Sequence, residues 1–238
     1  MGKADLHIHT RVSDGMANVS QVLEYVEHRT DLDVIAITDH EDALGGLLAR
    51  DLAVKRGYRF EVIVGAEITT LQGHVLALFV EQTPPSFRRV ESTLEMIHTQ
   101  GGLAVAPHPL SWLTRSLSAR TLNRLAGANG PRFDAIELGN PSPAGLRTAS
   151  KARSMNTATW GLPETGGSDA HHLGHVGTGW TTFPGTTAAD LREAIREGTT
   201  VARMSAYPAM AEIGFGQLLG GLAWGYAATP RKMFGRRR

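Results

Sequence analysis

The chain has 238 residues, of which 42% are hydrophobic and 20% are charged, so it can bury a core and is not expected to be wholly disordered. It contains no cysteine, which excludes disulfides, iron–sulfur clusters and thiolate zinc sites. The formal net charge is +1, but the body is mildly acidic once the basic C-terminal tail is set aside, so no stable nucleic-acid binding is expected. The N-terminus has no apolar signal region, which predicts a cytoplasmic protein.

Short apolar runs rich in β-branched residues alternate with amphipathic stretches along the chain. The runs predict seven strands, at residues 4–9, 33–38, 60–68, 74–80, 103–106, 135–138 and about 162–166. The stretches predict helices at residues 19–29, 46–56, 87–100, 119–126, 145–154 and 188–197. This alternation is typical of a parallel α/β sheet with crossover helices, and it favours one domain over residues 1–204.

Histidines and carboxylates gather where the predicted strands end. His7 and His9 are two residues apart on the first strand, so their side chains point to the same side. Loops at the carboxyl ends of strands build the active sites of α/β barrels, so we expect these donors to converge. The alternative is that each residue has a separate capping, turn or core role. The remaining donors are Asp14, His40, Glu67, His74, His108, Asp169 and His171.

Mixed imidazole and carboxylate donors suit zinc, manganese or iron. Nine donors exceed what one ion can use, so the sequence predicts two or three divalent metal ions, with a carboxylate such as Glu67 bridging two of them. Without cations, this many buried imidazoles and carboxylates would be strongly destabilising.

Four motifs in this set resemble those of the polymerase and histidinol phosphatase (PHP) superfamily: H-x-H at 7–9, D-H at 39–40, P-H-P at 107–109 and G-S-D-A-H at 167–171. The similarity covers residues 5 to about 198. It implies a distorted seven-stranded (β/α) barrel, similar to a TIM barrel, that holds a metal cluster. By this resemblance one ion is bound by His7, His9, Glu67 and Asp169, a second by Glu67, His74 and His108, and a third by Asp14, His40 and His171.

The chemistry expected of such a cluster is hydrolysis of a phosphate ester by a bridging hydroxide, with Glu67, Asp169 and His171 as the catalytic residues. The expected substrate is a small phosphorylated metabolite or nucleotide. A nucleotide is favoured over histidinol phosphate, because histidinol phosphatases of the family tend to carry histidine where this chain has Asp14. An amidohydrolase or esterase of the same fold and a non-catalytic, metal-stabilised binding module remain as alternatives.

Substrate contacts are expected from basic and polar residues near the strand ends. Arg115 is the first candidate, because similar nucleotide-hydrolysing members carry substrate-contacting basic residues at this distance after His108. Asp39 is expected behind the metal ligands, orienting an imidazole. The other candidates for substrate contact are Asn140, Arg147 and His175.

The C-terminal segment, residues 205–238, combines an apolar stretch with a basic tail. The apolar stretch at 213–228 is shorter than the roughly 20 residues needed to span a bilayer. We expect it to pack on the barrel as a helix, while the basic tail permits weak peripheral contact with an anionic membrane. The oligomeric state stays open.

Overall fold

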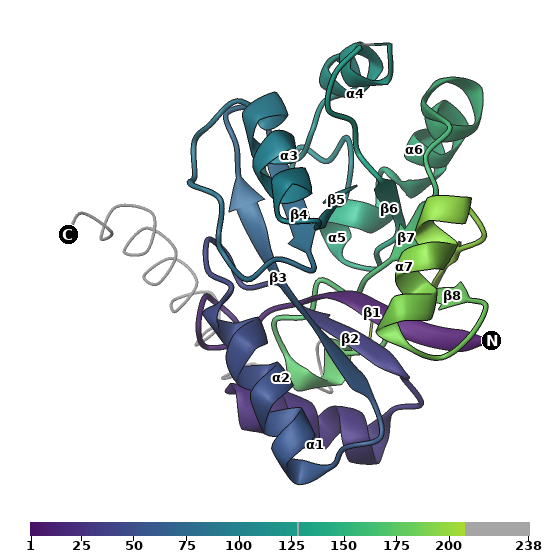
Figure 1. Ribbon diagram of the computed structural model, residues 1–238. Coiled ribbons are helices and arrows are strands. Elements are labelled where there is room, and N and C mark those ends of the chain that lie inside the picture. The colour runs from purple at the N-terminus through teal and green to yellow at the C-terminus, as the bar shows by residue number, and fades with distance from the viewer. Residues whose placement is uncertain (128, 208–238) are drawn as a thin grey trace.

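The computed structural model describes residues 1–127 and 129–207, and these form a mixed α/β fold around one nearly closed sheet (Figure 1). The order of the strands across the sheet is β7-β6-β5-β4-β3-β2-β1-β8-β9. Within the described residues the strands are β1 (Gly2–Ile8), β2 (Val34–Ile37), β3 (Glu61–Thr69), β4 (His74–Leu78), β5 (Leu103–Ala106), β6 (Ala135–Gly139), β7 (Glu164–Gly166), β8 (Gly179–Phe183) and β9 (Val201–Met204).

All seven predicted strands are present, but the described residues hold nine strands rather than seven. The sheet, which the sequence predicts to be parallel, is mixed. Strand β4 runs antiparallel to β3 and β5, and β8 runs antiparallel to β1 and β9. Only four residues, 70–73, separate β3 from β4. A crossover between parallel strands needs a dozen residues or more, so this short turn forces a hairpin.

The two ends of the sheet meet where glycine allows close backbone contact. A Cβ on Gly166 in β7 would lie 2.2 Å from the carbonyl oxygen of Trp180 in β8. A Cβ on Gly139 in β6 would lie 2.6 Å from the carbonyl oxygen of Arg203 in β9. The Thr181 hydroxyl joins the two ends, since it accepts from the Gly166 N–H at 2.8 Å and donates to the Gly166 carbonyl at 3.0 Å. These contacts close the sheet into a barrel-like shape.

Helices cover the outside of the sheet (Figure 1). Helices α1 and α2 pack together over β2, where Val22 and Leu23 join Ile35, Ile37 and Ala49 in one buried cluster. Helix α1 begins with a capping box between Asn18 and Gln21, and α7 begins with a capping box between Thr187 and Asp190. The helices are α1 (Val19–Arg29), α2 (Leu44–Arg56), α3 (Val90–Thr99), α4 (Ala119–Ala126), α5 (Pro143–Leu146), α6 (Ala149–Met155) and α7 (Ala188–Glu197).

The helix predicted at 145–154 is two short helices, α5 and α6. Ser142 and Pro143 start α5, because the Ser142 hydroxyl accepts from the N–H of Gly145 and Pro143 occupies the first turn. Helix α3 begins at Val90 rather than at Phe87. Phe87 has φ 56 and donates its N–H to the carbonyl of Thr69, so it belongs to the preceding loop.

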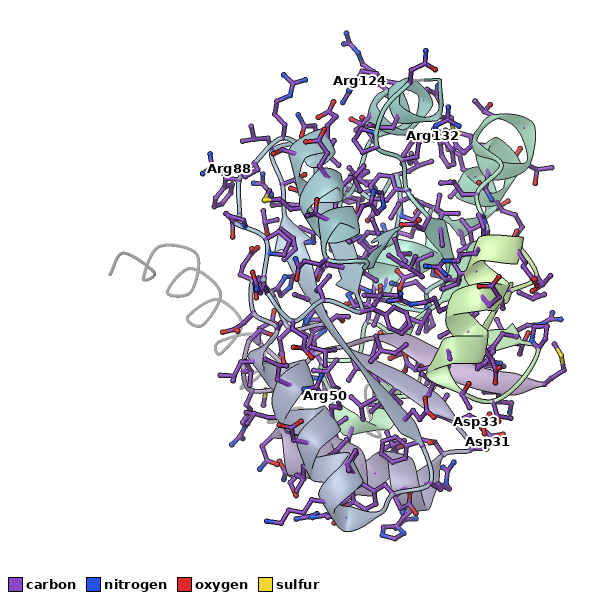
Figure 2. All side chains as sticks on the ribbon, viewed as in Figure 1. Asp31, Asp33, Arg50, Arg88, Arg124 and Arg132 are labelled. Carbon is purple, nitrogen blue, oxygen red and sulfur yellow. The ribbon has the colours of Figure 1, made fainter. Side chains whose placement is uncertain are left out.

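Arg124 and Asp31 lie at the edge of the molecule in Figure 2, and their side chains are 45% and 75% exposed. Arg50 pairs with Glu81, and Arg124 pairs with Glu91. Exposed pairs of this kind contribute little to stability. The predicted apolar helix at 213–228 and the basic tail lie outside the described residues. Among the helices that are described, none has the length and apolar character needed to span a membrane.

Candidate metal centre

All nine donors identified in the sequence meet at one rim of the barrel. Most follow the carboxyl ends of parallel strands, while His74 is the first residue of β4. Because β4 runs antiparallel to its neighbours, its amino end lies at the same rim as their carboxyl ends. The donors form four overlapping groups, and within each group the ligand atoms lie within 4.8 Å of one another. The groups are His9, Asp14, His40 and His171; His7, His9 and Asp169; His7, Glu67 and His108; and His40, Glu67 and His74.

The deepest part of this centre is formed by the two histidines of the first strand and two carboxylates. The Nε2 atoms of His7 and His9 each lie 3.5 Å from Oε2 of Glu67 and 3.5 Å from Oδ1 of Asp169. A tetrahedral ion with bonds of about 2.1 Å separates its ligand atoms by about 3.4 Å. The nitrogens of His7 and His9 and the oxygen of Asp169 lie within 4.8 Å of one another, so these three atoms are spaced as ligands of a single ion, and Oε2 of Glu67 contacts both nitrogens.

The second oxygen of Glu67 faces a different pair of imidazoles. Its Oε1 atom lies 2.8 Å from Nδ1 of His74 and 3.2 Å from Nε2 of His108. Glu67 itself is 1% exposed and lies in the carboxyl half of β3. Its two oxygens thus face different nitrogens, Oε1 those of His74 and His108 and Oε2 those of His7, His9 and His40, which is the arrangement that a bridging carboxylate requires.

A third group lies nearer the solvent. Oδ2 of Asp14 lies 3.3 Å from Nε2 of His171 and 3.6 Å from Nε2 of His40. The His9 ring takes part in both this group and the deeper one, and it stacks on the rings of His40 and His171, with centroids 4.7 and 4.3 Å apart. The side chain of His171 is 34% exposed, so this edge of the centre is open to solvent.

Several buried imidazole nitrogens in the centre have no hydrogen-bond partner. They are Nε2 of His7, both ring nitrogens of His9, Nδ1 of His40 and Nδ1 of His74. Leaving buried polar atoms unsatisfied costs about 1–3 kcal/mol each, so a cluster of them needs an explanation. Divalent cations would satisfy the one nitrogen of each neutral imidazole that carries a lone pair, and the nitrogen and oxygen donors fit such ions.

Electrostatics keep the carboxylates ionised. Burial raises the pKa of Glu67, but the neighbouring histidines, His74 and His40 foremost, lower it well below its usual value. Burial also opposes ionisation of Asp14 and Asp169, yet the pKa values of both carboxyls are lowered, chiefly by His171 at Asp14 and by His7 at Asp169. The centre therefore presents three negative charges to a cation at neutral pH.

Glu137 in β6 supports two of the donors, and the sequence analysis did not identify it. One of its oxygens lies 3.0 Å from Nδ1 of His7, and the other accepts from the N–H of His108 at 2.8 Å and from the Asn140 amide at 2.7 Å. Proton donation from Nδ1 to Glu137 fixes the tautomer that leaves Nε2 of His7 free to bind an ion. The signal for Glu137 was an acidic residue inside an apolar strand.

The backbone is strained at two of the donors. His108 has φ 27 and Asp169 has φ 54, in a region that residues other than glycine rarely adopt. Such strain persists where surrounding contacts hold it, and it clusters at functional sites. The bond from the His108 N–H to Glu137 is one of these contacts.

Asp39 is buried, but its hydrogen bonds go to the loop that carries Asp14. Its carboxylate accepts from the N–H and hydroxyl of Thr10, each at 2.7 Å, and from the N–H and hydroxyl of Ser13 at 3.1 and 2.6 Å. Asp39 therefore anchors this loop, and its predicted role in orienting an imidazole stays a prediction. The anchored loop places Asp14 beside His40 and His171.

Tyr207 is a second residue that the sequence analysis did not identify. Its hydroxyl donates to the carbonyls of Ser168 and Asp169, and its ring stacks on His175 with centroids 3.9 Å apart. His175 is 9% exposed, and burial lowers its pKa to about 4. Because Tyr207 covers His175, the predicted substrate contact of His175 stays a prediction.

The other candidates for substrate contact occupy different positions. Asn140 is 1% exposed and holds Glu137, so its contact with a substrate also stays a prediction. The guanidinium groups of Arg115 and Arg147 lie 5.8 Å from the ring of Phe87 and 5.9 Å from the ring of Trp112. The carbonyl of Arg115 accepts from the N–H of His74 at 2.6 Å, so its loop touches the metal centre.

Comparisons with known proteins agree with this geometry. The family model described as PHP-associated matches residues 151–200. An uncharacterised protein of Methanocaldococcus jannaschii is 36% identical over 129 residues, which are 50% of this chain and 74% of the relative. A phosphoribosyl 1,2-cyclic phosphate 1,2-diphosphodiesterase of Eggerthella lenta is 34% identical over 40% of this chain, and a 3′,5′-nucleoside bisphosphate phosphatase of Chromobacterium violaceum is 33% identical over 36%. These matches span 37% and 30% of the two enzymes.

Among solved structures, the fold is similar to a two-domain protein of Bacteroides vulgatus that contains a predicted PHP-like metal-dependent phosphoesterase. The TM-score is 0.66 at 20% identity, over 85% of this chain and 64% of that one. The barrel, the nine converging donors and these relatives lead to one conclusion. They support a PHP superfamily phosphoesterase.

Proposed function

We propose that the protein hydrolyses a phosphate ester of a small metabolite or nucleotide with the help of two or three zinc, manganese or iron ions. The observation that carries this proposal is the position of Glu67, whose two oxygens face two separate groups of imidazoles. A bound divalent ion supplies the Lewis acidity that activates water and neutralises charge on a phosphoryl group.

The nine donors would hold three ions, which differ in how deeply they lie below the surface. His7, His9, Glu67 and Asp169 are almost fully enclosed and would hold one ion between them. His74 and His108 would hold a second ion together with Glu67. A third would lie between Asp14, His40 and His171.

Substrate would enter from the exposed edge. Among the nine donors, His171 has the most exposed side chain. It would therefore meet an incoming phosphoryl group first. Arg115 and Arg147 supply positive charge on the loops after β5 and β6, which suits the anionic oxygens of a phosphate.

The experiment that tests this function is metal analysis followed by a hydrolysis screen. Protein loaded with manganese or zinc should release phosphate from nucleotides or sugar phosphates, and His74→Gln should lower that rate strongly. His28→Gln is the matched control, because the side chain of His28 is 67% exposed on α1. Cleavage of amide or ester substrates alone would favour the amidohydrolase alternative, and loaded protein that hydrolyses nothing would favour a binding module.

A further inference from the structure

We propose that Trp112 and Arg147 form a stacking platform for the aromatic base of a nucleotide, beside the metal centre. The inference rests on the proposed phosphoesterase function and specifies its substrate class. It starts from an unusual exposure: Trp112 is 75% exposed, whereas Trp160 is 7% exposed and donates its indole N–H to Asn123 at 2.7 Å. The exposed indole offers a large flat apolar face to a ligand.

The loop that carries Trp112 contacts the metal centre at two points. Nδ1 of His108 lies 2.8 Å from the Ser116 hydroxyl, and the carbonyl of Arg115 accepts from the N–H of His74. His108 and His74 are the two imidazoles that face Oε1 of Glu67. Trp112 therefore belongs to the loop that holds one half of the centre.

Arg147 approaches the same loop from the next strand along the sheet. It directly follows α5, which comes after β6, and its guanidinium lies 5.9 Å from the centroid of the Trp112 ring. The adjacent Thr148 hydroxyl donates to the carbonyl of Pro109 at 2.8 Å, which ties the two segments together. The pair thus emerges from the carboxyl ends of β5 and β6, at the rim where the ligands lie.

This combination matches the two parts of a nucleotide. The indole offers a flat apolar face to a base, and stacking of a base on an aromatic side chain tolerates any base. Arg115, on the same loop, offers positive charge to phosphate oxygens. A sugar phosphate without a base would use the charges but gain nothing from the indole.

The test compares two substrates that differ by the base alone, AMP and ribose 5-phosphate. Trp112→Ala should raise the KM for AMP ~10- to 100-fold relative to the KM for ribose 5-phosphate, as loss of one stacked base predicts. Trp112→Phe should restore most of the preference. Val54→Ala is the control, because Val54 is 79% exposed on α2, and it should leave the AMP reaction unchanged.

A binding measurement separates the platform from the chemistry. AMP should quench tryptophan fluorescence in the natural protein but not in Trp112→Phe, and ribose 5-phosphate should quench neither. An enzyme that hydrolyses both substrates with an unchanged KM ratio in Trp112→Ala would overturn the platform. The platform would also be overturned if the protein dimerised with rising concentration and Trp112→Ala abolished the dimer. The indole would then contact a second copy of the chain. If neither substrate is hydrolysed but AMP quenches Trp112, the platform stands and the proposed reaction fails.

Discussion

The Glu137 carboxylate joins the ring of His7 to the backbone of His108: one oxygen lies 3.0 Å from Nδ1 of His7, and the other accepts from the His108 N–H at 2.8 Å. A single buried side chain from β6 thereby sets the orientation of donors from β1 and from the loop after β5. These two donors face opposite oxygens of Glu67, so Glu137 aligns both halves of the centre.

Glu137→Ala should weaken metal binding about 10- to 100-fold, because His7 loses the partner that fixes its tautomer. Metal titration of the apoprotein measures this change, and excess metal should restore part of the activity. Glu164→Gln is the control, since Glu164 in β7 pairs with Arg153 away from the centre. Equal metal affinity in Glu137→Ala and the natural protein would contradict the supporting role of Glu137.

Glu67→Ala should lower phosphoesterase activity by several orders of magnitude, because one substitution removes ligand atoms from two groups. Activity assays at saturating metal check this expectation. A variant that kept near-normal turnover would show that Glu67 does not bridge.

Gly166→Ala should destabilise the protein by about 1–3 kcal/mol, because the added Cβ meets the Trp180 carbonyl where the barrel closes. The expected observation is a lower midpoint in thermal or denaturant unfolding. Gly130→Ala is the matched control, since a Cβ there has no atom within 4 Å among the described residues. The account of barrel closure fails if the two variants unfold alike.

Tyr207→Phe should lower the free energy of unfolding by about 1 kcal/mol, because the hydroxyl no longer bonds to the carbonyls of Ser168 and Asp169. Tyr207→Ala should cost more, since stacking on His175 is also lost. Denaturant unfolding of both variants tests this order, and a smaller loss in the alanine variant would refute it.

The fold could be predicted from the sequence where strands are apolar and end in polar donors. His7 and His9 lie two residues apart at the end of β1, Glu67 lies near the end of β3, and His108 follows β5. Strand β9 was missed because Ala202 is its one buried residue, so no apolar run marks it. The antiparallel direction of β4 was missed because the alternation of strands and helices along the chain favoured a parallel sheet. The turn of four residues between β3 and β4 was the signal for a hairpin.

Parts of the centre depend on contacts between residues far apart in the chain. Tyr207 reaches a carbonyl 39 residues away, and Glu137 reaches the ring of His7 across 130 residues. Patterns of neighbouring residues cannot predict contacts between residues so far apart in the chain. For Asp39, the position after a predicted strand placed the residue near the centre. The sequence could not show that its hydrogen-bond partners are Thr10 and Ser13, because the folding of the chain brings them together.

Elemental analysis of protein purified with manganese or zinc supplementation tests the central claim most directly. The account predicts two or three transition-metal ions per natural chain and fewer in Glu67→Ala, because Oε1 and Oε2 of Glu67 serve different groups of donors. Less than one ion per natural chain would contradict it.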